Sequence, residues 1–234
     1  VNGLIKTPAL WLSEEGEENE MVLSSRVRLA RNLEDRAFTH IASQEVLEDI
    51  REEVRAAVES SEVLSDPVVI EMDGIPANDR VLLAERRLIS HEMVMNYRHR
   101  SLIVDRDESL GVMINEEDHL RIQSMESGLA LRKAHKRIDD LDDDLDQRVE
   151  FAYSDRLGYL TACTTNVGTG LRVSAMLHLP GLVHNNDIRQ VIDGLRQVRL
   201  TVRGSYGEGS EVMGNFFQIS NSITLGLSES DTVA

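Results

Sequence analysis

Apolar positions recur along this chain with two spacings, one typical of helices and one typical of strands. A helix is predicted from Ser43, a favourable N-cap, through Glu59, because the apolar residues between them recur every three or four positions. A second helix is predicted after Asn186, which can cap its first turn. The apolar face of that second helix consists of Ile188, Val191, Ile192 and Leu195.

Strands are predicted where short apolar runs end at turn residues. The runs cover residues 67–72, 102–104, 110–114, 159–163, 173–179, 200–203 and 215–220. Residues 102–104 and 110–114 flank the polar turn 105–108, so we expect them to pair as a hairpin. Strands in hairpin-like succession, with helices between pairs, predict an α+β fold with a largely antiparallel sheet flanked by helices.

The aspartate run from Asp139 to Asp146 is a candidate cation site at first sight. Ile138, Leu141 and Leu145 keep a helical stripe through it, so we expect an amphipathic helix with its aspartates on the opposite, solvated face. The seven histidines show no paired metal spacing, and one cysteine cannot build a structural zinc site. No protein metal ligand is predicted.

Composition narrows the class of protein. The 234 residues include 41 acidic and 25 basic side chains, and the net charge of −16 argues against nucleic-acid binding. No apolar run is long enough for a membrane span, and the only cysteine, Cys163, fits a reducing cytoplasm. We expect an acidic lead-in over residues 1–21 and one domain over residues 22–234.

Four segments supply arginines, namely SSRVRLAR (24–31), NEEDHLR (115–121), CTTNVGTGLR (163–172) and RGSYGEGSE (203–211), and the last three add carboxylates or glycines. Such a combination suits phosphoryl transfer, because polyphosphate charge needs preorganised cations and a nucleophile needs a carboxylate to orient it. Solvated strand ends and surface ion pairs would explain any one segment alone. Neither a Walker loop nor the protein-kinase signatures occur.

Together, and in this order, the four segments resemble the catalytic domain of the phosphagen (ATP:guanidino) kinases, and most of all bacterial protein arginine kinases of the McsB type. The likeness runs from Val22 to Leu227. It implies an antiparallel sheet flanked by helices, ATP with Mg²⁺, arginine-containing protein substrates and a cytoplasmic location. It also implies an activator protein and a Clp-type protease as partners, whereas the charge and the apolar pattern predict neither nucleic acid nor membrane as a partner.

The resemblance assigns three catalytic residues. Glu117 would orient the guanidinium, a poor nucleophile, and accept its proton. Glu208, between Gly207 and Gly209, would close on the substrate in a mobile loop. Cys163 would lie beside the guanidinium and tune the reaction without acting as a nucleophile.

The resemblance also assigns the nucleotide site, with Arg26, Arg28, Arg121, Arg172 and Arg203 as a cage around the phosphates. The other assigned positions are Ser24, Ser25, Val27, Arg87, Val173, Ser174, Ala175, Met176, Gly204, Ser205, Tyr206 and Gly207. Arg87 departs from the family, which has a histidine there, and His91 is the alternative replacement. Magnesium would be held by phosphate oxygens and water.

Three functions are compared. The leading one is a kinase for arginine side chains in proteins, the second a kinase for a small free guanidino compound, and the third a silent module that binds arginine-rich proteins. Glu117, Glu208 and the arginines count against the third. Only 23 residues precede Ser24, too few for the helical domain of small-guanidino kinases, so we expect an open guanidinium pocket. We also expect the family's helical C-terminal domain to be absent.

Overall fold

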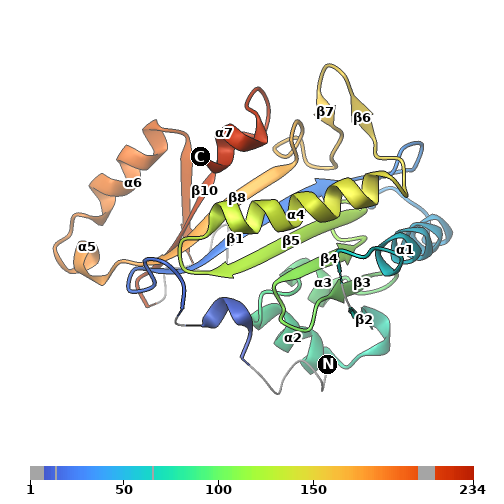
Figure 1. The fold of residues 1–234 in the computed structure, drawn as a ribbon, viewed down its shortest axis with the longest axis horizontal. Helices are drawn as coiled ribbons and strands as arrows, with labels where there is room; N and C mark the ends of the chain where they lie inside the picture. Colours follow the sequence, from blue (N-terminus) through green and yellow to red (C-terminus); the bar gives the residue numbers. More distant parts are fainter. Residues whose placement is uncertain (1–7, 14, 65, 205–213) are drawn as a thin grey trace.

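An antiparallel sheet of eight strands forms the centre of the computed structural model, which describes residues 8–13, 15–64, 66–204 and 214–234 (Figure 1). The strand order is β2-β3-β4-β5-β1-β8-β10-β9. The strands are β1 (Val22–Arg31), β2 (Val68–Glu71), β3 (Ser101–Val104), β4 (Leu110–Ile114), β5 (Leu120–Ser127), β8 (Leu171–His178), β9 (Leu200–Gly204) and β10 (Phe216–Asn221). A separate hairpin consists of β6 (Tyr153–Ser154) and β7 (Gly158–Tyr159).

Seven α-helices and two short 3₁₀ helices accompany these strands in the described ranges. They are η1 (Leu10–Leu12), α1 (Gln44–Glu59), η2 (Met72–Gly74), α2 (Ala77–Glu85), α3 (His91–Met95), α4 (Leu131–Asp146), α5 (Pro180–His184), α6 (Ile188–Gln197) and α7 (Glu229–Val233). The predicted α+β class with a largely antiparallel sheet is confirmed. Within the described ranges no helix is both long and apolar enough to cross a membrane.

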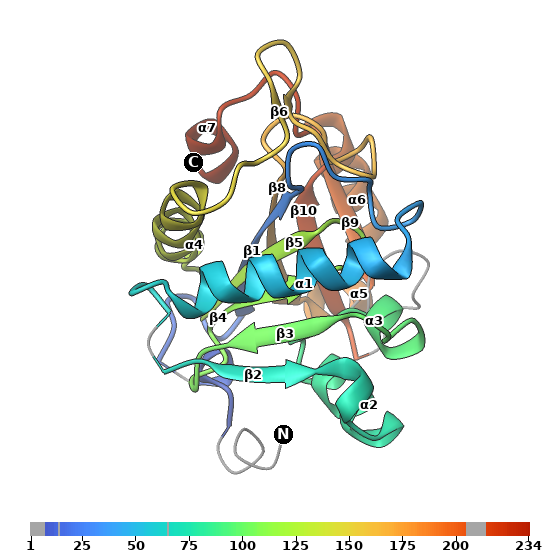
Figure 2. The same ribbon diagram turned by 90° about the vertical axis from the view of Figure 1, so that its right-hand side faces the viewer.

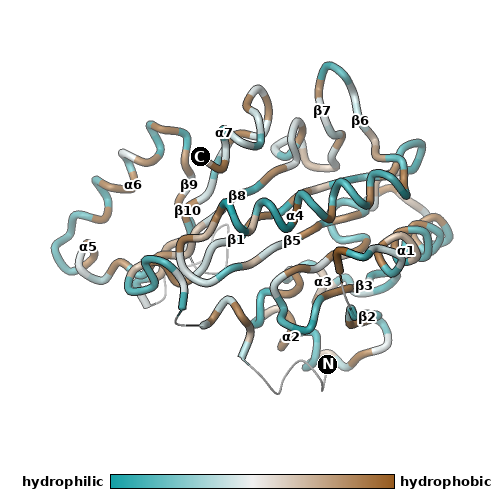
Figure 3. Tube along the Cα trace, viewed as in Figure 1, coloured by the Kyte–Doolittle hydropathy of each residue, from teal (hydrophilic) through white to brown (hydrophobic). Residues whose placement is uncertain are grey.

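The main core lies between one face of the sheet and the helices α1 and α4 (Figures 1 and 2). Val27 and Leu29 of β1 belong to this core together with Ile138 and Leu141 of α4, all at most 1% exposed. Figure 3 shows hydrophobic and hydrophilic positions alternating along both helices, as expected of helices that cover a sheet on one side. Ser43 caps α1 by accepting a hydrogen bond from the backbone N–H of Val46 at 3.3 Å.

A second core lies on the other face, but only over one end of the sheet. Leu83 of α2 and Met93 of α3 pack there against Leu102 and Met113 of β3 and β4. Because these two short helices stop at β4, the same face of β5, β1, β8, β10 and β9 is left for the cleft described below.

Three local predictions are wrong. The strand expected over residues 159–163 is limited to Gly158–Tyr159, because the N–H of Ala162 bonds to the Asp118 side chain instead of a strand. Asn186 takes a left-handed conformation (φ 62°), and Asp187 occupies the N-cap of α6. Asp142, expected on the solvated face of α4, is 6% exposed and pairs with the buried Arg31 at 2.6 Å.

Candidate functional site

A row of arginines crosses the face of the sheet opposite to the main core. Side chains alternate along a strand, so Arg26 and Arg28 of β1 point away from the core that holds Val27. Arg28 of β1 is paired in register with Arg172 of β8. Two residues further along β1, Ala30 is paired with Arg121 of β5. The pairing of β1 with β5 and β8 therefore collects arginines that are far apart in the sequence.

Burial and mutual repulsion perturb these arginines. Burial, and after it the charges of Arg121 and Arg87, lowers the pKa of Arg26 to about 9. Burial and the neighbouring guanidinium groups also lower the pKa of Arg28 well below its ordinary value. The Arg28 Nε atom is buried without a hydrogen-bond partner among the described residues. An arrangement of this kind favours a multiply charged anion, which would offset the repulsion between the guanidinium groups and supply the missing acceptor.

Three adjoining cavities run along this face and form the cleft. The apolar cavity, about 410 Å³, and the arginine cavity, about 170 Å³, share Arg26, Arg87 and Gln218 in their lining. The carboxylate cavity, about 390 Å³, shares Arg28, Arg121 and Arg203 with the arginine cavity. The cleft thus changes along its length from apolar walls to guanidinium groups and then to carboxylates.

Glu116, Glu117 and Asp118 follow one another in the turn between β4 and β5, beside the carboxylate cavity. Glu117 is the exposed member, and partial desolvation, then Asp118 and Glu116, raises its pKa. Glu116 is 5% exposed and lies 2.9 Å from Arg121. Burial alone would raise the pKa of Glu116, but Arg121, the Ser90 hydroxyl and the N–H of Glu117 lower it to about 2. One carboxylate therefore holds a cage arginine while its neighbour is free to face a substrate.

Buried hydrogen bonds fix the conformation of this turn. The Asp118 carboxylate accepts hydrogen bonds from Asn32 Nδ2 at 2.6 Å and from the N–H of Ala162 at 2.7 Å. The Nδ1 atom of His119 accepts a hydrogen bond from the N–H of Leu33, and its Nε2 lies 3.0 Å from the carbonyl oxygen of Ala37. Because burial also lowers the pKa of His119, the neutral ring serves as a structural link. The backbone carrying Glu117 is consequently held in place from both sides.

Cys163 lies in the loop 160–170 and lines the same carboxylate cavity as that turn. It is half-buried, and its Sγ is 3.0 Å from the hydroxyl of Thr165. In the same loop Gly168 has φ 114°, and a Cβ there would lie 2.2 Å from the carbonyl oxygen of Thr224. The glycine is therefore required for close backbone packing, which places the Cys163 loop against the end of the sheet.

Arg172 anchors this loop as well as contributing charge. Its guanidinium donates hydrogen bonds to the Asn166 side chain at 3.2 Å, to the Thr165 carbonyl at 3.1 Å and to the Asn221 carbonyl at 2.8 Å. Asn166 and Thr165 line the carboxylate cavity together with Cys163. A change at Arg172 would therefore disturb both the charge of the cleft and the shape of its wall.

Most of the predicted site residues described in the structure line the cleft. They are Ser24, Arg26, Arg28, Arg87, Glu117, Arg121, Cys163, Arg172, Ser174, Met176 and Arg203. Gly204 ends β9 without lining a cavity. Ser205, Tyr206, Gly207 and Glu208 lie outside the described residues.

Four predicted nucleotide-site residues do not point into the cleft. Val27 and Val173 are in the main core, and Ser25 and Ala175 alternate with cleft residues on the same two strands. The Ser25 hydroxyl instead bonds to the carbonyl of Gly128 and the N–H of Ala130, ahead of α4. A contiguous motif in a strand always places half of its side chains on each face.

Several cleft residues were missed by the sequence prediction. Asp118, Asn166, Gln123 and Gln218 line it as hydrogen-bonding groups, and Trp11, Met125 and Phe216 line its apolar end. Gln123 shares a strand face with Arg121 on β5, so strand alternation was a usable signal for it, whereas Gln218 reaches the cleft through its cross-strand pairing with Arg203. His91 and Arg87 both line the arginine cavity.

One group of potential metal ligands occurs among the described residues, His135, Asp139 and Glu229. It lies on α4 and α7, and α4 packs on the core side of the sheet, away from the cleft. His135 Nε2 is 3.2 Å from Glu229, and this hydrogen bond raises the pKa of His135. The hydrogen bond between His135 and Glu229 accounts for the close approach of these two side chains.

The sequence matches the family described as ATP:guanido phosphotransferase, C-terminal catalytic domain, over residues 49–234. A protein-arginine kinase from Syntrophomonas wolfei is 46% identical over 225 residues, which cover 94% of this chain and 63% of that protein. A protein-arginine kinase from Clostridium tetani is 42% identical, with 95% and 65% covered. The chain spans somewhat less than two thirds of these relatives.

Two solved structures share the fold. A duplicated taurocyamine kinase from Schistosoma mansoni, with bound transition state analog components, superposes with a TM-score of 0.82 at 27% identity, over 98% of this chain and 33% of that one. Lombricine kinase superposes with a TM-score of 0.79 at 21% identity, over 95% and 65% of the two chains.

Proposed function

This chain belongs to the ATP:guanido phosphotransferase family, and on that premise we propose that it transfers the γ-phosphoryl group of ATP to arginine side chains in proteins. The family match confirms the resemblance inferred from the four ordered motifs. The single observation that best supports the proposal is the cleft itself, in which a cavity with an available carboxylate adjoins one lined by arginines.

The proposed chemistry follows from the order of groups along the cleft. A guanidinium in the carboxylate cavity would pair with Glu117, which aligns one nitrogen with the γ-phosphorus and accepts the proton lost from that nitrogen. The N–P bond forms as the bond from the γ-phosphorus to its bridging oxygen breaks, and ADP leaves. Arg28, Arg121 and Arg172 stabilise the charge on the transferring group and on ADP.

Magnesium is proposed to arrive with ATP and to neutralise part of the phosphate charge. The described carboxylates of the carboxylate cavity are Glu116, Glu117 and Asp118. Glu116 is engaged with Arg121, and Asp118 accepts two hydrogen bonds. These contacts support a magnesium ion held by phosphate oxygens and water, without a protein ligand.

The choice of a protein over a free amino acid as the substrate rests on relatedness. The relatives named protein-arginine kinase are 46% and 42% identical to this chain, whereas the taurocyamine kinase and the lombricine kinase with the same fold are 27% and 21% identical. A kinase for a small free guanidino compound is the second candidate, because the same cleft would serve it.

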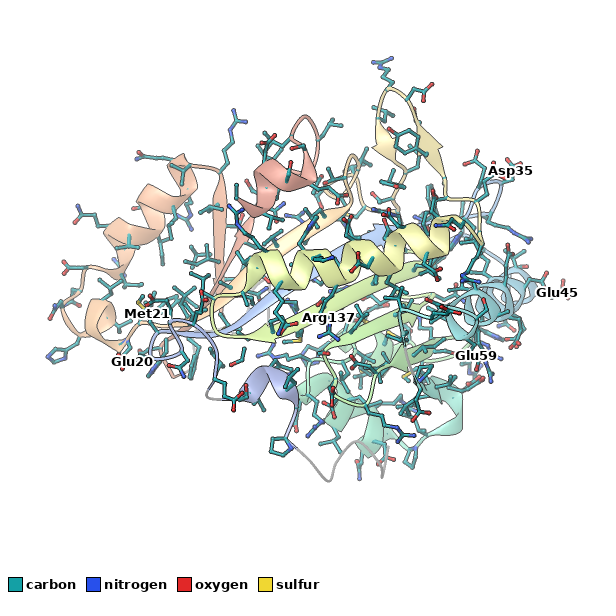
Figure 4. The ribbon with its side chains drawn as sticks, in the orientation of Figure 1. Glu20, Met21, Asp35, Glu45, Glu59 and Arg137 are labelled. Carbon is teal, nitrogen blue, oxygen red and sulfur yellow. The ribbon has the colours of Figure 1, made fainter. Side chains whose placement is uncertain are left out.

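The deciding experiment compares an arginine-rich protein with free arginine as the acceptor of ³²P from ATP, at matched guanidinium concentrations. We expect acid-labile phosphate on protein arginines and a far higher kcat/KM for the protein. Glu117→Gln should abolish the signal, while Glu45→Gln, an exposed α1 variant (Figure 4), should keep it. A higher kcat/KM for free arginine would select the second candidate. ATP binding without transfer to either acceptor would leave a silent binding module.

The setting of the reaction belongs to the same proposal. A cytoplasmic location is supported by the single, free cysteine. An activator protein and a Clp-type protease stay predictions from the family resemblance. Pull-down with the chain as bait would test both partners.

A further inference from the structure

The apolar cavity lies at the end of the cleft opposite to Glu117. Its lining includes Trp11, Met125, Met176 and Phe216, while Arg26 stands where it meets the arginine cavity. Ser174 and Gln218 add hydrogen-bonding groups to the same walls. A flat, largely apolar ring attached to a chain of phosphates matches this sequence of surfaces, with the ring in the apolar cavity and the phosphates among the arginines.

Trp11 enters this cavity from the segment that precedes the sheet. It lies in η1, is 7% exposed, and packs with Ala9, Met125 and Leu23 in a cluster of its own. Its Nε1 is buried with no hydrogen-bond partner among the described residues, so polar interactions do not account for its position. The indole is held there by apolar contact with strands β1 and β5.

The segment around Trp11 is fastened to the sheet at several points. The N–H of Leu10 bonds to the carbonyl of Asp107 at 3.2 Å, in the turn between β3 and β4. Beyond the end of β5, the N–H of Leu129 bonds to the carbonyl of Glu17 at 2.7 Å. The segment then turns into β1 at Glu20 and Met21 (Figure 4). Trp11 is therefore placed by a docked segment and not by a free arm.

Two glycines permit this docking. A Cβ on Gly16 would lie 2.4 Å from the carbonyl carbon of Ser127, and a Cβ on Gly128 would lie 2.3 Å from the carbonyl oxygen of Glu17. Real side chains do not fit at such distances, so any larger residue at Gly16 must lift the segment from the end of β5. Gly16 itself does not line the apolar cavity.

We propose that Trp11 forms a wall of the base-binding end of the nucleotide site, so that docking of residues 8–13 and 15–21 onto β5 contributes to nucleotide affinity. This inference rests on the proposed function, because it takes the ligand of the cleft to be a nucleotide. The indole ring contacts the heterocyclic base, while the arginines bind the phosphates without help from the segment.

The chain contains one tryptophan, so its fluorescence reports on Trp11 alone. ADP without an acceptor should change the Trp11 emission, because the base replaces water against the indole. Inorganic tripolyphosphate has no base. Calorimetry should show that it binds, and the Trp11 emission should stay unchanged. An equal emission change with both ligands, or none with bound ADP, would overturn the proposal.

Variants test the same inference without relying on fluorescence. Trp11→Ala and Gly16→Val should each weaken ADP binding roughly tenfold, the scale of one lost base–aromatic contact, while tripolyphosphate binding stays unchanged. Leu12→Ala, at an adjacent residue that is 47% exposed and outside the cavity lining, should bind both ligands like the wild type. Trp11→Phe is a further, more conservative variant. If Gly16→Val, Trp11→Phe and Trp11→Ala are all folded and all retain wild-type ADP affinity, Trp11 is not part of the site.

These measurements separate the two proposals. A wild-type chain that binds ADP with the expected Trp11 response, yet phosphorylates neither protein arginine nor free arginine, supports the base site and refutes the proposed kinase activity. A chain that phosphorylates arginine but shows no loss of ADP affinity in Trp11→Ala and Gly16→Val refutes the base site and leaves the activity in place.

Discussion

Arg28 of β1 and Arg172 of β8 are direct cross-strand partners on the cleft face of the sheet. Like charges directly opposite one another destabilise a sheet unless other groups compensate. Arg172 is compensated by hydrogen bonds to Asn166 and two backbone carbonyls, whereas the buried Nε of Arg28 has no acceptor among the described residues. The free protein therefore holds an unfavourable charge pair that a bound polyphosphate would relieve.

Arg28→Met tests this relationship. Removing one of two opposed charges should leave the melting temperature of the free protein unchanged or raise it, because the buried Nε of Arg28 has no hydrogen bond to lose among the described residues. The same change should weaken tripolyphosphate binding at least about tenfold, since a charge-assisted contact disappears. Differential scanning fluorimetry and calorimetry measure the two effects. Arg196→Met, which breaks an exposed pair on α6, is the control and should leave binding intact.

Glu117→Gln should lower kcat by about 10²–10⁴-fold, the usual contribution of a general base, with little change in melting temperature. The pH profile is the sharper test. The active form is the carboxylate, and its pKa is raised by desolvation and by Asp118 and Glu116. Activity should therefore fall, as the pH is lowered, at a higher pH than an ordinary glutamate would give. The residual activity of the variant should not show this fall at low pH. If the fall persists in the variant, it is caused by the titration of another group.

Asp118→Ala should loosen the loop that carries Cys163. The Asp118 carboxylate accepts hydrogen bonds from the N–H of Ala162, next to Cys163, and from the side chain of Asn32. Without it, we expect faster alkylation of Cys163 by iodoacetamide and a lower kcat. In the wild type, ATP with an acceptor should slow alkylation, because Cys163 lines the carboxylate cavity. Alkylation at the wild-type rate in Asp118→Ala would show that the loop is positioned by other contacts.

Glu116→Gln should reduce stability in a pH-dependent manner. The pKa of Glu116 is lowered in the folded state from 4.5 to about 2, so its contribution is fully present above pH 4.5 and is lost as the pH falls toward 2. At neutral pH the loss should be on the order of 3 kcal/mol. Urea unfolding should show a large difference between wild type and variant at pH 7 that narrows below pH 4.5. A pH-independent difference would contradict this explanation.

Asp142→Asn should be the most destabilising single change in the aspartate run. It leaves the Arg31 guanidinium, which is 1% exposed and stacked 3.4 Å from the centre of the Tyr159 ring, without its buried partner. Breaking such a pair costs about 3–5 kcal/mol. Asp140→Asn is the matched control, because Asp140 is exposed and pairs only loosely with Lys136 at 3.7 Å. Equal melting temperatures for the two variants would refute the assignment.

The sequence predicted the outer strands of the sheet, β2, β3, β4, β9 and β10, and the helix from Ser43 to Glu59. Their apolar residues form short runs or recur with a clear period. The central strands β1 and β5 were not predicted, although they carry the cleft. Arginine, serine and glutamine occupy their cleft-facing positions, so neither strand contains an uninterrupted apolar run. The feature that makes these strands functional also hides them from a hydropathy pattern.

By itself, the sequence determined the fold class and the set of chemically active residue types, since four ordered motifs and local periodicity depend only on neighbours along the chain. Only the tertiary structure decided which side of each motif is used, burying Val27 and Val173 while presenting Arg28 and Arg172. It also placed Trp11 against the apolar cavity and Asp142 against Arg31. These relationships depend on strand register and on packing between distant segments, and contacts of that kind are set by the burial of the whole sheet.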